Sequence, residues 1–308
     1  MDSAWSRNGI SLATGMKLIW CSWTRPARSL RRPELVVLLG RPRIAFLKIR
    51  LVRLYHHRGQ RIRRAHHLNC ASPLNNQSLH DLAVNFVMTR YVGSNASQLQ
   101  FEYLPDLCQQ PGHHEHFHLS VCAVGLAGYS AVKRIPELTR TARMKYVPAI
   151  RQVNVALGSP EIAWKDSTMA SVILLGMFEV IVSPSQKSWE TYTRHLNGAI
   201  ELAKMGSLQQ FETDVGISLF KHLSLNIIVN CTLQSNPIHE YFIAMRRQLP
   251  GVDNLASPPS RFFNLMLRWV KFSHDVQSGS YASPTLVMEG ALDLGRDLTR
   301  FGQIMLPK

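Results

Sequence analysis

From about residue 80 to the end of the chain, apolar residues recur at the spacing of an α-helix, and alternating runs typical of half-buried strands are few. The segments that follow this spacing are separated by short stretches that contain Pro, Gly or Ser, residues that end helices. We therefore predict an all-α fold, an irregular stacked helical array in one domain. The segments show no strict repeat, which argues against a solenoid of identical units.

The most apolar run, KDSTMASVILLGMFEVIV at residues 165–182, is predicted to be a buried helix. Its length favours a helix, although its Val and Ile residues alone would also suit a strand. Asp166 or Ser167 is suited to cap its start. The residues expected to form its buried stripe are Met169, Val172, Ile173, Met177 and Val180.

Further helices are predicted on both sides of this run, at residues 78–93, 119–132, 140–158, 188–206, 214–233, 239–249 and 260–277. Pro148 should break the third of these or start a new helix, because proline cannot donate the backbone hydrogen bond that a helix interior requires. Large aromatic residues are expected in the core: Trp164, Trp189, Phe262, Phe263 and Trp269. The last apolar stretch, which begins near residue 285, has no capping sequence after it, and this is typical of a domain truncated at its C-terminus.

The basic character of the chain belongs to its N-terminal segment. The formal net charge is +15, and residues 1–69 alone hold 15 Lys and Arg against Asp2 and Glu34. Pro26, Pro33 and Pro42 interrupt any regular period there. We predict that residues 1–77 form a disordered basic extension. An arm that binds nucleic acid non-specifically and a mitochondrial presequence are alternative interpretations of the same segment.

Cysteine usage excludes two kinds of architecture. The five cysteines, Cys21, Cys70, Cys108, Cys122 and Cys231, lie far apart and form no CxxC pair. A disulfide framework and a cysteine zinc cluster are therefore not expected, and a reducing intracellular compartment fits best. No uninterrupted apolar run is long enough to span a bilayer, so we expect no membrane partner.

The stretch PGHHEHFHLS at residues 111–120 contains an HExxH motif formed by His114, Glu115 and His118. In zinc metalloproteases this motif places two imidazoles and a general base on one helix face. Here Pro111 and Gly112 precede it, so the motif should lie in a loop or in a first helical turn. A solvated polar linker is the favoured interpretation. Adventitious metal affinity of a His-rich tract and a zinc-dependent hydrolase remain alternatives.

His195 and the pair Arg246 and Arg247 are two further candidate positions. His195 lies on a mostly apolar helix, where a hydrogen-bonded packing role is more common than a ligand contact. Arg246 and Arg247 are expected on a solvated face at a helix C-terminus, where cations are favoured. The chain shows no glycine-rich phosphate loop and no nucleophile elbow, so we predict no catalytic residue, no metal ligand and no cofactor.

The order and spacing of several segments carry a family resemblance. These segments are HDLAVNFVMTRYV, FEYLPDL, LSVCAVGLAGYS, YVPAIRQVNVAL, KDSTMASVILLGMFEVI, WETYTRHLNGAIELAKMG and GISLFKH. Together, over about residues 78–250, they resemble the fungal-specific transcription factor domain, the helical regulatory region that follows a zinc binuclear cluster in many fungal transcription factors.

The resemblance implies a nuclear transcriptional regulator without catalysis of its own, which serves in dimerisation or in the response to an effector. It implies protein partners, namely the transcription machinery or a zinc-cluster factor, in a homo- or heterodimer, with DNA reached indirectly. The chain departs from the family pattern because residues 1–77 contain only Cys21 and Cys70, whereas the zinc cluster needs six thiolates. We therefore predict a regulatory domain at residues 78–308 that lacks its own DNA-binding module.

Overall fold

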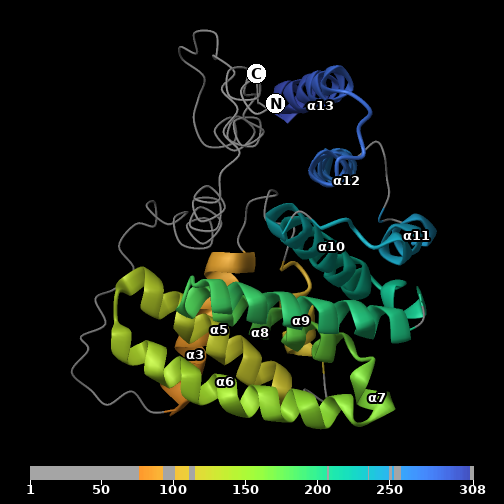
Figure 1. The fold of residues 1–308 in the computed structure, drawn as a ribbon. Coiled ribbons are helices and arrows are strands. Elements are labelled where there is room, and N and C mark those ends of the chain that lie inside the picture. Colours follow the sequence, from red (N-terminus) through yellow and green to blue (C-terminus); the bar gives the residue numbers. More distant parts are fainter. Residues whose placement is uncertain are drawn as a thin grey trace. The chain divides into compact units, whose positions relative to one another are not determined.

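The computed structural model describes residues 76–92, 101–110, 115–206, 208–234, 236–249, 252 and 258–305. This part of the chain is helical and contains no strand, which confirms the predicted all-α fold (Figure 1). The predicted basic extension lies outside the described residues as far as residue 75, and helix α3 (Asn76–Val87) begins within its last two positions.

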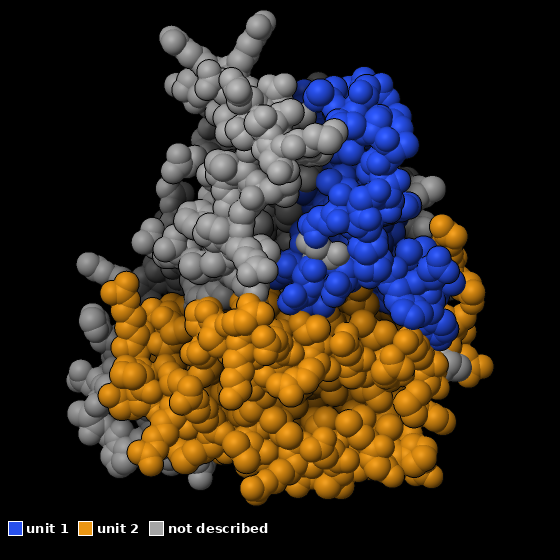
Figure 2. Space-filling model, viewed as in Figure 1, with its two compact units in different colours: residues 1–47, 228–246, 253–308 blue, residues 48–227, 247–252 orange. Residues whose placement is uncertain are grey.

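The chain divides into two compact units (Figure 2). The larger unit holds residues 48–227 and 247–252, and the smaller one holds residues 1–47, 228–246 and 253–308. That residues 78–308 act as one regulatory domain stays a prediction.

Helices α5 (Glu115–Lys133) and α8 (Asp166–Val182) form the centre of the larger unit. Helix α5 packs against α3, α8 and α6 (Pro136–Leu157), while α8 also packs against α6 and α9 (Gln186–Met205) (Figure 1). Small residues let α5 approach its neighbours closely. A Cβ at Gly125 would lie 2.3 Å from the carbonyl oxygen of Ala83 in α3, so only glycine fits where these two helices cross.

Helix α8 is buried on nearly every side. The five residues of its predicted stripe are all buried, and so are Leu174, Leu175, Phe178 and Ile181. Burial of each such side chain contributes about 1.5–3 kcal/mol. The prediction of a buried helix is confirmed, but the helix begins at Asp166 after Lys165, and no side chain caps it.

Helix α6 corrects one prediction from the sequence. Pro148 lies inside this helix, which continues from Pro136 to Leu157 without a break. The residues around the proline, Tyr146 and Ala149, are buried. We attribute the intact helix to this packing, which offsets the hydrogen bond that the proline removes.

Shorter elements complete the larger unit. They are the π-helical turn η1 (Met88–Val92), α4 (Leu104–Gln109), α7 (Pro160–Ala163) and the 3-10 turn η2 (Leu208–Phe211). Trp164, at the C-terminal end of α7, is 48% exposed, so its predicted place in the core was wrong. It follows a four-residue helix that is too short to bury the large indole ring.

Helix α10 (Asp214–Gln234) is long and apolar enough to cross a membrane by length and composition alone. Most of the helix is buried in the protein, and core helices of soluble proteins pass the same test. Its buried polar groups also have protein partners, because Asn226 accepts a hydrogen bond from Tyr192 and His222 contacts Tyr103. These contacts are those of a core helix.

The smaller unit contains α12 (Pro258–Gln277) and α13 (Pro284–Met305), which pack against each other. Arg268 of α12 forms ion pairs with Asp293 and Asp297 of α13. Arg246 of α11 (Glu240–Gln248) is buried, with its guanidinium 3.6 Å from the centre of the Phe263 ring. The predicted solvated position of Arg246 was therefore wrong, because a cation over an aromatic face is stabilised away from water.

Candidate functional site

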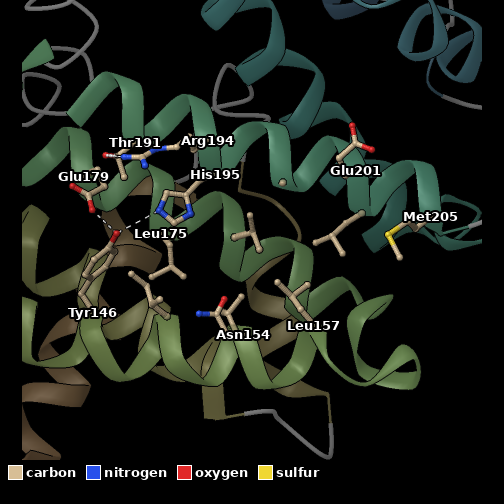
Figure 3. A pocket seen from close by; sticks show the side chains of 15 residues that line it. Tyr146, Asn154, Leu157, Leu175, Glu179, Thr191, Arg194, His195, Glu201 and Met205 are labelled. Atoms are coloured by element: carbon tan, nitrogen blue, oxygen red, sulfur yellow. Dashed lines mark hydrogen bonds between the residues drawn. The ribbon is translucent and has the colours of Figure 1, made fainter. Parts of the chain in front are cut away.

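The larger unit contains a cavity of about 620 Å³ between α6, α8 and α9 (Figure 3). Helix α8 forms part of its wall, and α6 and α9 supply most of the remaining side chains. The lining residues are Tyr146, Ile150, Val153, Asn154, Leu157, Val172, Leu175, Glu179, Thr191, Arg194, His195, Gly198, Glu201, Leu202 and Met205. The volume falls within the range of small-molecule sites, about 300–1,000 Å³.

Three polar side chains meet at one end of this cavity (Figure 3). The Tyr146 hydroxyl donates a hydrogen bond to the Glu179 carboxylate, and it lies 3.4 Å from Nε2 of His195. The Tyr146 ring also stacks on Phe178, with 4.2 Å between the ring centres. One residue from each of the three helices therefore meets at a single point, which we call the polar end.

Burial sets the protonation of the polar end. It lowers the pKa of His195, an effect that Arg194 reinforces and Glu179 opposes. Burial and the adjacent Glu179 carboxylate raise the pKa of Tyr146. At neutral pH the phenol therefore keeps its proton for Glu179, and the imidazole is neutral.

Most of the remaining lining side chains are apolar, and Asn154, Thr191, Arg194 and Glu201 are the polar ones among them. Leu157 and Met205 are labelled at the far side in Figure 3, together with Glu201, and Leu175 lies near His195. Val172 and Leu202 are further apolar residues of the lining. Leu157 and Met205 are 41% and 65% exposed, so this far side is open to solvent. The site thus has one polar end, and its far side is apolar at Leu157 and Met205 but also carries the exposed carboxylate of Glu201.

Two glycines shape the cavity. Gly176 of α8 faces α9, and a Cβ there would lie 3.1 Å from Cβ of His195 and 3.3 Å from Cδ2 of Tyr192. It therefore sets how closely the two helices approach. Gly198 lines the cavity itself, and a Cβ there would meet only Val172, at 3.9 Å. A side chain at position 198 would therefore occupy the cavity without displacing the backbone.

The other charges around the cavity already have partners. Glu201 forms an ion pair of 2.7 Å with Lys204. Arg194 is exposed and donates to the hydroxyl of Thr191. Among the residues that the structure describes, no Lys or Arg forms an ion pair with the Glu179 carboxylate. The arrangement is suited to binding a molecule that has both a polar and an apolar part.

The HExxH motif lies at the start of α5, in a different part of the unit. His114 lies outside the described residues. Glu115 is exposed on the first turn of the helix, and the ring of His118 lies 6.1 Å from that of His80. Within the described ranges, no group of three or more His, Cys, Asp or Glu side chains could hold a metal ion. The predicted position of the motif in a first helical turn agrees with the placement of Glu115 and His118.

Sequence reasoning considered only one member of the polar end, His195, and favoured a packing role for it. The structure shows a half-buried His195 that also lines the cavity. Tyr146 and Glu179 were not singled out, since 49 residues separate Tyr146 from His195 and no local motif joins the three positions. A Glu at the end of an otherwise apolar helix was the one available signal.

The three helices that line the cavity lie within a segment that matches a known family. Residues 84–229 match the family model of the fungal specific transcription factor domain. The match confirms the resemblance stated from the sequence and supports a general role in transcription regulation. Members of this family are in general not enzymes. No curated protein and no solved structure matches the chain.

Proposed function

We propose that this chain is a nuclear transcription regulator that binds a small-molecule effector in the α6–α8–α9 cavity and acts through protein partners, without catalysis. The observation that carries the proposal is the cavity itself, which lies inside the family-matched segment and has a hydrogen-bonded polar end. Such sites combine a mostly apolar lining with a few polar groups that fix the orientation of the ligand.

The position of the cavity gives the effector a means of regulation. Helices α6 and α9 are separated in sequence by α7 and α8, and both line the cavity. An effector that contacts both helices shifts the protein toward the helix arrangement that it binds more tightly. The size of the shift is set by the difference between its affinities for the alternative arrangements. A change in the spacing of α6 and α9 would move α6 and, with it, the outer surface that α6 presents to solvent.

The outer surface of α6 is suited to a protein partner. Arg140, Met144, Val147, Arg151 and Val155 recur at helical spacing and are all exposed. Met144 and Val155 are 60% and 68% exposed, and large apolar side chains in this number on one helix face favour an interaction site. Three apolar side chains and two arginines on one helix face are suited to a partner segment that carries both acidic and apolar side chains. Such a segment would belong to the transcription machinery or to a zinc-cluster factor. DNA would then be reached through the partner.

A reporter assay tests the proposal. The full chain is fused to an unrelated sequence-specific DNA-binding domain, and transcription from a matching promoter is measured. We compare the unaltered chain with Gly198→Leu, which fills the cavity. Leucine also has the higher helix propensity, by up to about 1 kcal/mol, so unfolding is not expected. Gly295→Leu in α13 is the matched control, because no atom lies within 4 Å of a Cβ there.

We expect Gly198→Leu to change the reporter output at least threefold, and Gly295→Leu to leave it unchanged. Equal output from all three fusions would contradict an effector role for the cavity. A parallel substitution, Val147→Asp, should reduce the output if α6 contacts a partner, with helicity by circular dichroism unchanged.

A further inference from the structure

We infer that the effector is an amphiphilic cation, a protonated amine attached to an elongated apolar body. Its ammonium group binds the Glu179 carboxylate, and its body lies along the cavity toward Met205. The inference rests on the proposed function, because it names the chemical class of the effector for the same site.

The first argument concerns the charge of Glu179. This carboxylate is half-buried on a mostly apolar helix, and the neutral hydroxyl of Tyr146 donates a hydrogen bond to it. A carboxylate that leaves water is costly unless a cation or several hydrogen bonds compensate it. Within the described part of the chain, no lysine or arginine forms an ion pair with it. A ligand ammonium group supplies the missing positive charge.

The two partners of Glu179 at the polar end, Tyr146 and His195, bring no positive charge to its carboxylate. The imidazole of His195 is neutral at neutral pH, because burial lowers its pKa, so it brings no competing cation. The Tyr146 hydroxyl occupies one side of the carboxylate and holds it in place. The remaining lone pairs of the carboxylate can accept hydrogen bonds from an ammonium group.

The shape of the cavity argues for an elongated apolar body. His195 and Met205 are ten residues apart on α9, which corresponds to about 15 Å along the helix. Val172 and Leu202 are buried and line the same cavity. An alkyl chain or a similar slender body fits this path and removes apolar surface from water.

An anionic head group suits the polar end poorly, because it would face Glu179 directly. Arg194 also lies at this end, where its charge acts on Tyr146 and His195, but its guanidinium is exposed and donates a hydrogen bond to the hydroxyl of Thr191.

The test is a calorimetric titration of the full chain with three ten-carbon probes, decylamine, decanol and decanoate, each below the concentration at which it aggregates. Glu179→Gln removes the charge but keeps an acceptor for Tyr146. Glu190→Gln is the matched control, since Glu190 is exposed on α9 outside the cavity lining. Gly198→Leu reports whether any binding occurs in the cavity.

We expect decylamine to bind with one molecule per chain, and decanol and decanoate to bind at least tenfold more weakly. Glu179→Gln should weaken decylamine at least tenfold and leave decanol unchanged, Glu190→Gln should change neither, and Gly198→Leu should weaken decylamine binding. The inference is overturned if decylamine does not bind, if decanol binds as tightly, or if Glu179→Gln has no effect.

The outcomes separate this inference from the proposed function. If Gly198→Leu changes the reporter output and decylamine does not bind, the cavity is regulatory but its ligand is not an amphiphilic cation. If decylamine binds through Glu179 and the reporter output ignores Gly198→Leu, the ligand class is correct and the regulatory role of the cavity is wrong.

Discussion

The larger unit contains two contacts between a tyrosine and a histidine, and they differ in almost every other respect. Tyr103 and His222 lie 2.9 Å apart in the core, and both side chains are almost completely buried. Tyr146 and His195 lie 3.4 Å apart at the edge of a cavity, together with the carboxylate of Glu179. The first contact satisfies buried polar atoms, whereas the second includes an acceptor with capacity for a further partner. Unused bonding capacity beside a cavity, more than the residue types themselves, marks a binding site.

The largest expected effect concerns the placement of a carboxylate on α8. Glu179 is tolerated because it reaches the cavity and Tyr146, whereas Ile173 is 4% exposed among apolar neighbours. We predict that Ile173→Asp unfolds the protein, because an unpaired buried charge costs several kcal/mol, a large share of about 5–15 kcal/mol of total stability. Circular dichroism would show the loss of helicity. Retention of native helicity would contradict the central position of α8, and Met144→Asp on the exposed face of α6 is the control.

A smaller effect is expected from pH at the buried contact. Burial lowers the pKa of His222 to about 3, and its immediate neighbours are the Tyr103 hydroxyl and the ring of Phe101. Above pH 6.5 the histidine is neutral in the folded and unfolded chains and adds no pH dependence. Below pH 6.5 only the unfolded chain takes up the proton, so the free energy of unfolding falls by about 1.4 kcal/mol per pH unit.

Urea denaturation at pH 6.5 and pH 5 measures this effect. We expect the native chain to lose about 1.7 kcal/mol more than His222→Gln over this interval, slightly less than the full slope gives, because the unfolded histidine is already half protonated at pH 6.5. Equal losses in the two proteins would mean that His222 accepts a proton in the folded state.

The smallest expected effect compares the two tyrosines directly. Tyr103→Phe removes the partner of a buried imidazole nitrogen and should lower the free energy of unfolding by about 1–3 kcal/mol. Tyr146→Phe should lower it by less than about 1 kcal/mol, because water can reach Glu179 through the cavity. Denaturation of both variants under one set of conditions gives the difference. If Tyr146→Phe lowered the free energy of unfolding more than Tyr103→Phe, the Tyr146–His195 contact would be the structural one, contrary to this assignment.

The fold could be predicted from the sequence where local patterns determine it. The apolar run at residues 165–182 predicted α8, and the predicted helices at 214–233 and 188–206 agree with the start of α10 and, to within one residue, the end of α9. The errors arose where tertiary contacts outweigh local preference. Pro148 stays helical between packed residues, and Arg246 is buried against Phe263, which is 17 positions later in the chain.

The candidate site was largely beyond prediction for the same reason. Its polar end joins residues of three helices, and the distance between them depends on how those helices pack. Only His195 could be singled out, because a titratable residue on an apolar helix is visible in sequence alone. The roles of Tyr146 and Glu179 became apparent from their positions in the structure.

The close approach at Gly176 links the crossing of α8 and α9 to the geometry of the cavity. This glycine lies outside the cavity lining, but a side chain at its position would contact Cβ of His195, which does line the cavity. An alanine there would require its neighbours on α9 to shift by a few tenths of an ångström, without altering any residue that lines the cavity. A substitution at the crossing of α8 and α9 would therefore change the position of His195 relative to the cavity, and a comparison of lining residues alone would miss the difference.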